Sequence, residues 1–218
     1  MKAMILAAGR GERLRPLTDH TPKSLVEVRG QSLLQRHLQN IRNAGIEDVV
    51  INLGWLGAQI VERIGTGAAY GLNVAYSDEG DDILETGGGI HNALSLLGDK
   101  PFLVVNADIL TDMPVPEVAL TNVDMGHLVM VRSPDYRNGG DFDLDNERIR
   151  NGESQSLTFS GIAVYRPEFF DGCEAGRFSI VPMLREAADA DLLQGSVYEG
   201  LWADVGTPER LAAINRVR

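Results

Sequence analysis

The sequence predicts an α/β fold in which an open, mixed and mostly parallel sheet is flanked by helices and continues into a β-rich portion. In the first half, short apolar runs alternate with segments of helical hydrophobic spacing, as expected when strands of a parallel sheet are buried on both faces. Beyond residue 126, apolar runs are separated by glycine pairs, which is typical of hairpins. Because no linker rich in Gly, Ser or Pro interrupts the chain, we expect a single domain over residues 1–218.

The first half begins with an apolar run at Lys2–Ala7, which predicts a buried strand ahead of a glycine-rich loop. Apolar residues at helical spacing then predict a helix over about 32–44, which Gly45 ends. The next predicted elements are a strand at Val49–Leu53, a helix with the stripe Leu56, Ile60 and Ile64, a strand at Leu72–Tyr76, a helix reaching Leu97 and a strand at 101–105. This alternation is that of a Rossmann-like sheet with helices on both faces.

The second half predicts strands at His127–Arg132 and Leu157–Tyr165, with turns at Gly139-Gly140 and Asn151-Gly152 between them. Residues 182–190 and 207–217 read as helices, and Pro208 suits the first helical position of the latter.

Composition excludes several classes of protein. The formal net charge of −11 would repel a polyphosphate backbone over most of the surface, so nucleic acid is not expected as a partner. No apolar run approaches the length of a bilayer span, so no membrane association is expected either. The single Cys173 cannot close an internal disulfide, which fits a reducing compartment. We therefore expect a cytoplasmic protein.

Positive charge is concentrated near the amino terminus. Residues 1–36 contain seven Lys or Arg and three Asp or Glu, and several of these cations lie in the loop that follows the first predicted strand. Ligands of open α/β sheets bind outside the carboxyl ends of the strands. Glycines at this position let backbone N–H groups approach phosphate oxygens, and Arg13 and Lys23 can neutralise their charge. The loop is therefore predicted to bind phosphate.

Two common phosphate-binding motifs do not match this loop. The dinucleotide motif requires a third glycine where the chain has Leu14, and the P-loop requires Gly-Lys-Ser/Thr where it has Gly11-Glu12-Arg13. The loop is thus of a different kind, and its distinguishing residues are the Arg-x-Arg-Pro-Leu-Thr run and Pro22-Lys23.

Two aspartates occupy positions where an isolated carboxylate is costly. Asp108 follows a predicted buried strand, and Asp204 lies within the short apolar stretch 202–205. Mg²⁺ commonly combines one or two carboxylates with substrate phosphates and water, so these residues are candidate metal ligands. Each could equally cap a turn or helix; Asp204 lies close enough to Thr207 for that.

The motifs together resemble those of the sugar nucleotidyltransferase family, whose members join a nucleoside triphosphate to a sugar 1-phosphate. The resemblance covers nearly the whole chain. It rests on Leu6-Ala-Ala-Gly-Arg-Gly-Glu-Arg-Leu-Arg-Pro-Leu-Thr18, Pro22-Lys-Ser-Leu-Val26, Glu85-Thr-Gly-Gly-Gly89, Val105-Asn-Ala-Asp108, Phe159-Ser-Gly161 and Trp202-Ala-Asp-Val-Gly206. It implies a nucleotide-binding part over about 1–110 and a sugar-binding part over about 111–218.

The resemblance also implies roles for individual residues. Arg13, Lys23 and Asp108 are implied to be catalytic, and Asp108 and Asp204 to hold Mg²⁺. The expected nucleotide-binding residues are Ala8, Gly9, Gly11, Glu12, Arg13, Lys23, Gly87, Gly88 and Asn106. The base is expected against the backbone of 87–89, because glycine is unfavourable inside a helix by about 1 kcal/mol and a need for close approach would explain three of them.

The expected reaction is attack by a phosphate oxygen of the sugar 1-phosphate on the α-phosphorus of UTP, with release of pyrophosphate. The attacking oxygen is already anionic, so positioning and charge neutralisation must supply the rate. Hydrogen-bonding groups that could hold the sugar are Asp141, Glu153, Ser160 and Gly161.

Within the family, three segments resemble the branch that transfers uridylyl groups to N-acetylmuramate 1-phosphate in peptidoglycan recycling. These segments are 84–90, 140–142 and 158–162. A guanylyltransferase acting on mannose or heptose 1-phosphate is the first alternative, and a nucleotide-sugar sensor without catalysis is the second. Small-molecule substrates are the expected partners of a monomer or small homo-oligomer.

Overall fold

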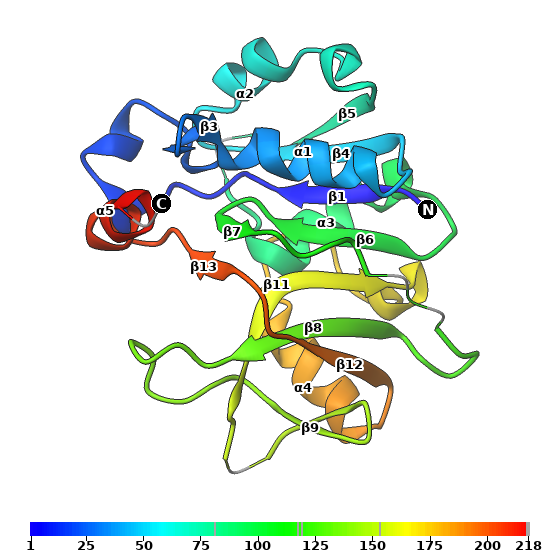
Figure 1. Ribbon diagram of the computed structural model, residues 1–218. Coiled ribbons are helices and arrows are strands. Elements are labelled where there is room, and N and C mark those ends of the chain that lie inside the picture. The colour runs from blue at the N-terminus through cyan, green and yellow to red at the C-terminus, as the bar shows by residue number, and fades with distance from the viewer. Residues whose placement is uncertain (81, 117, 119, 153, 217–218) are drawn as a thin grey trace.

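A single open sheet runs through the molecule in the computed structural model, which describes residues 1–80, 82–116, 118, 120–152 and 154–216 (Figure 1). Its strand order is β5-β4-β1-β6-β11-β8-β12-β10-β9. The strands are β1 (Ala3–Leu6), β4 (Asp48–Leu53), β5 (Asn73–Asp78), β6 (Phe102–Asn106), β8 (Gly126–Arg132), β9 (Asp143–Asp145), β10 (Arg148–Arg150), β11 (Leu157–Tyr165) and β12 (Leu193–Tyr198). Two small ribbons pair β2 (Glu27–Val28) with β3 (Gln31–Ser32), and β7 (Ile109–Thr111) with β13 (Trp202–Asp204).

The strands β5, β4, β1 and β6 are parallel, and the chain visits them in an order that reverses direction across the sheet. It begins at β1, moves outward to β4 and β5, and then returns to the other side of β1 at β6. The carboxyl ends of β1 and β6 therefore lie side by side at the point where the order reverses. Ligands of open α/β sheets bind in the crevice at such a point.

Helices cover both faces of the sheet, and alternate residues of β1 show which helices lie where. Ile5 packs in one cluster with residues of α1 and α2, and Met4 packs in the other with residues of α3 and α4. The helices are α1 (Leu33–Asn43), α2 (Gly57–Ile64), α3 (Glu85–Leu97), α4 (Val181–Asp189) and α5 (Pro208–Arg216). The predicted α/β class, with a mixed sheet flanked by helices, is confirmed.

The second half of the sheet is mixed. β11 pairs antiparallel with both β6 and β8, and β12 pairs parallel with β8. The segment between β8 and β11 contains the β9–β10 hairpin, whose turn is Asn146-Glu147 rather than a glycine pair. Both turn residues have positive φ, which is what a two-residue hairpin turn with the sheet's twist demands. β12 was not among the predicted strands.

The last helix packs against the loop that follows β1. Leu211 and Ile214 of α5 contact a buried cluster that includes Leu14 and Val205. The backbone N–H and guanidinium of Arg29 bond the α5 residues Asn215 and Ile214. α5 therefore supports the segment around Leu14, which includes Arg13.

None of the helices in the described part of the chain has both the length and the apolar character needed to cross a bilayer.

Candidate active site

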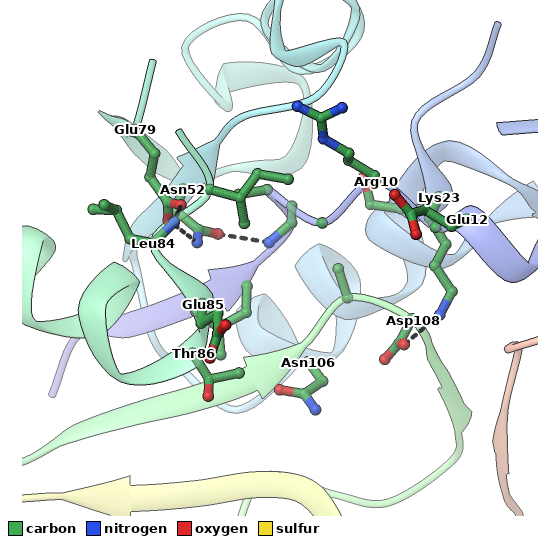
Figure 2. Close-up of a pocket in the computed structure, with 18 of the residues that line it drawn as sticks. Arg10, Glu12, Lys23, Asn52, Glu79, Leu84, Glu85, Thr86, Asn106 and Asp108 are labelled. Carbon is green, nitrogen blue, oxygen red and sulfur yellow. Dashed lines mark hydrogen bonds and ion pairs between the residues drawn. The ribbon is translucent and has the colours of Figure 1, made fainter. Parts of the chain in front are cut away.

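A cleft of about 930 Å³ opens at the carboxyl ends of β1 and β6, where the strand order reverses (Figure 2). It is lined by most of the residues that the sequence singles out for nucleotide binding. Those lining it are Ala8, Gly9, Gly11, Glu12, Arg13, Lys23, Asn106 and Asp108. The first six come from the chain after β1 and the last two from the end of β6, so two segments about 90 residues apart form one site.

The loop after β1 owes its shape to Gly11. Its φ of +63° is a conformation that side chains rarely adopt, and a Cβ there would come within 2.9 Å of Thr18 Cγ2 and 3.1 Å of Lys23 Cβ. The Thr18 hydroxyl donates to the Gly11 carbonyl at 2.8 Å, and the Leu14 N–H donates to the same oxygen at 2.8 Å. The loop is therefore folded tightly onto itself, with Lys23 beside it.

Lys23 and Asp108 form an ion pair in the cleft, with Nζ and Oδ2 separated by 2.5 Å. The lysine side chain is 14% exposed and the aspartate side chain 34% exposed, so both charges remain accessible from the cleft. Asp108 follows the end of β6, and Lys23 begins a short 3-10 turn after Pro22. A cation and a carboxylate thus meet where the phosphates of a nucleotide are expected.

The backbone of Asp204 adjoins that of Asp108, because β13 and β7 run antiparallel and pair Asp204 with Ile109. The Val205 N–H donates to the Asp108 carbonyl at 2.8 Å, so the two aspartates sit on adjoining backbone segments. Asp204 is not itself part of the cleft wall, but Gly206 is. A Cβ on Gly206 would come within 3.2 Å of Arg13 Nη2 and 3.3 Å of Asp204 Oδ2, so the cationic and acidic groups gather at the same place.

Two side chains already contact the Asp204 carboxylate. Arg210 Nη1 donates to Oδ2 at 2.5 Å, and the Tyr136 hydroxyl donates to Oδ1 at 2.6 Å. The Arg210 guanidinium also lies over the Tyr136 ring, 3.8 Å from its centroid. Burial, together with the neighbouring Asp204, raises the pKa of Tyr136 to about 12, so this phenol stays protonated and donates to the carboxylate.

The acidic residues present suit a divalent cation that is bound partly by substrate. In the described ranges no three His, Cys, Asp or Glu side chains cluster as a metal centre. Asp108 and Asp204 supply hard oxygen ligands on adjoining segments, and Mg²⁺ commonly takes only one or two carboxylates when phosphates and water complete its shell. Their carboxylates are thus of the ligand type that such a cation takes.

The other end of the cleft contains a polar network that was not predicted. The Asn52 side chain accepts from the Ala7 N–H at 2.6 Å and donates to Glu79 Oε1 at 2.6 Å, while the Leu84 N–H donates to Glu79 Oε2 at 2.8 Å. Figure 2 shows Glu79, Asn52 and Leu84 together, on the opposite side of the cleft from Lys23 and Asp108. Burial raises the pKa of the Glu79 carboxyl.

Gly87 and Gly88 do not line the cleft; both are buried in α3. A Cβ on Gly87 would come within 2.5 Å of the Phe178 ring, and a Cβ on Gly88 would collide with the Gly176 carbonyl. Packing of the segment around 176–178 against α3 is thus sufficient to explain these two glycines. The neighbouring Leu84, Glu85 and Thr86 do line the cleft.

Three of the four candidate sugar-binding residues lie around an irregularity in β11. The strand register shifts between Phe159 and Ile162, and Gly161 has a φ of +83°. A Cβ on Gly161 would come within 2.6 Å of the Asn106 side chain, so this bulge adjoins the cleft. Asp141 accepts from the Phe159 N–H at 2.9 Å and pairs with Arg137, while Ser160 is buried and its hydroxyl accepts from the Ile162 N–H. Glu153 lies outside the described residues.

The sequence contained signals for some of the residues that were missed. Asn52 is a polar residue near the carboxyl end of an otherwise apolar strand, and Glu79 directly follows the next strand. Both positions meet the rule that ligands bind beyond strand ends. Arg210 and Tyr136 carried no such signal, because only the fold brings their segments to Asp204.

Comparison with known proteins agrees with this geometry. A sequence model of the family described as "Nucleotidyl transferase" matches residues 2–136, a span that contains Arg13, Lys23 and Asp108. The chain belongs to this family. The "N-acetylmuramate alpha-1-phosphate uridylyltransferase" of Neisseria meningitidis serogroup B is 48% identical over 97% of this chain and 95% of its own length. The Caulobacter vibrioides protein of the same name is 34% identical over 99% of this chain and 96% of its own length.

A solved structure shares the fold. It is a "putative glucose-1-phosphate thymidylyltransferase" from Bacillus anthracis, crystallised with sucrose, and superposes with a TM-score of 0.85 over 99% of this chain and 94% of its own. At 20% identity this likeness concerns the fold alone.

Proposed function

We propose that the chain transfers a uridylyl group from UTP to a sugar 1-phosphate, N-acetylmuramate 1-phosphate, as a step of peptidoglycan recycling. The observation that supports this most directly is the Lys23–Asp108 pair beside the glycine loop at the reversal of strand order. The full-length similarity to two N-acetylmuramate 1-phosphate uridylyltransferases supports the choice of base and sugar.

The reaction needs positioning more than acid–base chemistry. A phosphate oxygen of the sugar 1-phosphate attacks the α-phosphorus of UTP, the bond from that phosphorus to the bridging oxygen breaks, and pyrophosphate leaves. Arg13 and Lys23 would neutralise the phosphate charge, and the backbone N–H groups of 8–11, residues that line the cleft, would donate to phosphate oxygens. No proton has to be removed from the attacking oxygen, because it is already ionised.

We propose Mg²⁺ as the cofactor, held by Asp108 and Asp204. When bound, it would balance charge on the triphosphate. This proposal is supported by the position of Asp108 after the end of β6 and by the pairing of β13 with β7, which brings the backbone of Asp204 beside it. Asp108 also holds the Lys23 ammonium in the cleft at 2.5 Å.

The sugar is proposed to lie beside the bulge of β11, next to Asn106. Gly161 brings the bulge against the Asn106 side chain, and Asp141 is anchored to the neighbouring Phe159 N–H. Hydroxyl and amide groups of a sugar could bond to Asp141 and to the bulge backbone there. Asn106 lines the cleft, so it is placed to bond either the ribose or the sugar.

The test is a pyrophosphate-release assay on the purified protein with N-acetylmuramate 1-phosphate, MgCl₂ and UTP, CTP, GTP, ATP or dTTP in turn. We expect release with UTP to exceed release with the others. A preference for GTP with mannose 1-phosphate would favour a guanylyltransferase. Silence with every nucleotide and with both sugars, in protein that still binds nucleotide, would favour a sensor without catalysis.

A further inference from the structure

Arg10 is a cation of the cleft wall to which the reaction above gives no role. The other cationic side chains of the wall have acidic neighbours. Lys23 pairs with Asp108, Arg177 pairs with Glu85, and Arg13 lies beside Gly206 where the Asp204 carboxylate also lies. Among the described residues, the ion pairs within 4.0 Å do not include Arg10. Of the described cations that line the cleft, Arg10 shares this lack of an ion pair only with Arg13, which has the Asp204 carboxylate nearby.

The Arg10 side chain is held by an aromatic ring rather than by a carboxylate. Its guanidinium carbon lies 5.3 Å from the centre of the Trp55 ring, which is within the range of a cation–π contact. Trp55 is itself bonded to the loop after β1 at two points. Its indole N–H donates to the Thr18 carbonyl at 2.9 Å, and its backbone N–H donates to the Ala8 carbonyl at 3.2 Å.

The approach of these two loops depends on Gly54. A Cβ at Gly54 would come within 2.7 Å of the Ala8 carbonyl oxygen, so a side chain there would push the Trp55 segment away from the loop. The loop after β4 is thus built to place an aromatic ring beside Arg10. This arrangement orders an exposed arginine at the mouth of the cleft.

A cation–π contact uses the charge of a guanidinium and pairs none of its N–H donors with an acceptor, so those of Arg10 remain able to bind a ligand. The guanidinium can therefore contact an aromatic ring and bind phosphate in a bidentate manner at the same time. Figure 2 shows Arg10 and Lys23 on the same side of the cleft, with the Arg10 guanidinium extending away from the Lys23–Asp108 pair. The two cations are thus placed to meet different phosphates of one triphosphate.

We propose that Arg10, ordered by Trp55, binds the terminal phosphates of the nucleoside triphosphate and hence the pyrophosphate leaving group. When the bond between the α-phosphorus and the bridging oxygen breaks, negative charge develops on the departing pyrophosphate, and Arg10 stabilises it there. This inference rests on the proposed function and adds a substrate contact to it. It predicts that Arg10 matters to UTP and to free pyrophosphate, which carry the phosphates of the leaving group, and not to the nucleotide sugar, whose diphosphate joins uridine to the sugar instead.

The experiment uses Arg10→Met, which keeps an unbranched side chain of about the length of the aliphatic part of arginine and removes the charge. In the forward direction we expect kcat/KM for UTP to fall roughly ten- to hundredfold, the value of one charge-assisted hydrogen-bonded contact. In the reverse direction we expect KM for pyrophosphate to rise by a similar factor while KM for UDP-N-acetylmuramate stays unchanged. Calorimetric titration with pyrophosphate and with UMP should show weakened binding only of pyrophosphate.

Three further variants test whether the effect is specific to Arg10 and whether it depends on the Trp55 ring. Arg63→Met removes an exposed arginine in the last turn of α2, outside the cleft, and should leave every constant unchanged. Trp55→Leu removes the ring and should weaken pyrophosphate binding, whereas Trp55→Phe keeps a ring and should weaken it less. Melting curves confirm that each variant is folded.

The experiments distinguish a failure of this inference from a failure of the proposed function. Equal losses for pyrophosphate and UDP-N-acetylmuramate in Arg10→Met, or no loss for either, would overturn the role of Arg10 while leaving the uridylyltransferase intact. A wild-type protein that releases no pyrophosphate from UTP would refute the proposed function and this inference with it.

Discussion

Asp108 and Asp204 each have a cationic partner within the chain, Lys23 and Arg210 respectively. These contacts compensate two carboxylates that would otherwise repel each other and the phosphates of a substrate. They also mean that a divalent cation bound by the aspartates must share them with, or displace, an ammonium and a guanidinium. Lys23 with Asp108 and Arg210 with Asp204 thus form two ion pairs at the phosphate end of the cleft.

Lys23→Met tests the contribution of the Lys23–Asp108 pair to the reaction. We expect kcat for pyrophosphate release to fall by a factor on the order of 10²–10³, because one charge-stabilising contact at the transferred phosphate is lost. Stability should change by only about 1 kcal/mol, since the Lys23–Asp108 pair is partly open to solvent. Steady-state assays and urea unfolding measure the two effects.

Arg42→Met is the matched control for Lys23→Met. It also breaks an ion pair, that of Arg42 with Glu47, but in an exposed position outside the cleft. We expect a wild-type rate from this control. A wild-type rate from Lys23→Met itself would contradict its placement in the active site.

At the scale of the elements, the sequence predicts best what depends on neighbouring residues. The buried strands β1, β4 and β6 and the amphipathic helix α1 follow from local apolar patterns, and the glycine loop follows from local motifs. β12 was missed because Gly195 interrupts its pattern, and the need for that glycine is non-local: a Cβ there would collide with Ile149 of β10.

The residues of the candidate site also differ in whether a local sequence pattern reveals them. Arg13 and Lys23 belong to a continuous motif and could be found by reading along the chain. The contact of Tyr136 with Asp204 depends on a loop and a strand 68 residues apart, and no local pattern encodes it. Short strands such as β7 and β13 are three residues long, which is too short for periodicity to reveal, yet their pairing is what brings Asp204 to Asp108.

Gly88 of α3 provides a test at the scale of an element. Helix propensity alone favours Gly→Ala by about 1 kcal/mol. In this helix a Cβ at Gly88 would collide with the Gly176 carbonyl, so we expect Gly88→Ala to destabilise the protein by about 1–3 kcal/mol. Urea unfolding without any nucleotide measures this, and a stability equal to or above the wild type would show that packing does not require glycine there.

At the scale of the whole molecule, the sheet and α1 enclose a histidine that folding keeps neutral. His37 of α1 is 3% exposed, and its Nε2 has no hydrogen-bond partner among the described residues. Burial lowers its pKa from 6.5 to about 4. Because the unfolded chain binds a proton at this histidine more readily than the folded chain, stability contributed by the neutral form is lost as the pH falls from about 6.5 to about 4.

The loss attributable to His37 should approach roughly 3 kcal/mol between pH 7.5 and pH 4, from the difference between its folded and unfolded pKa values. His37→Gln removes the titrating group. The unfolding free energy of the wild type should therefore fall relative to that of the variant as the pH is lowered from 7.5 to 4. Denaturant unfolding at several pH values measures it. Parallel pH profiles for the two proteins would contradict the assignment.

The packing of α5 against Leu14 has a practical consequence for anyone preparing this protein. Figure 1 shows α5 next to the loop after β1, whereas the amino end of the chain lies at the far end of β1 from that loop. An affinity tag or fluorophore fused behind α5 would therefore sit near the loop after β1, several residues of which line the cleft. Fusion ahead of Met1 keeps such an addition away from it, and kinetic measurements are best made on protein labelled at that end.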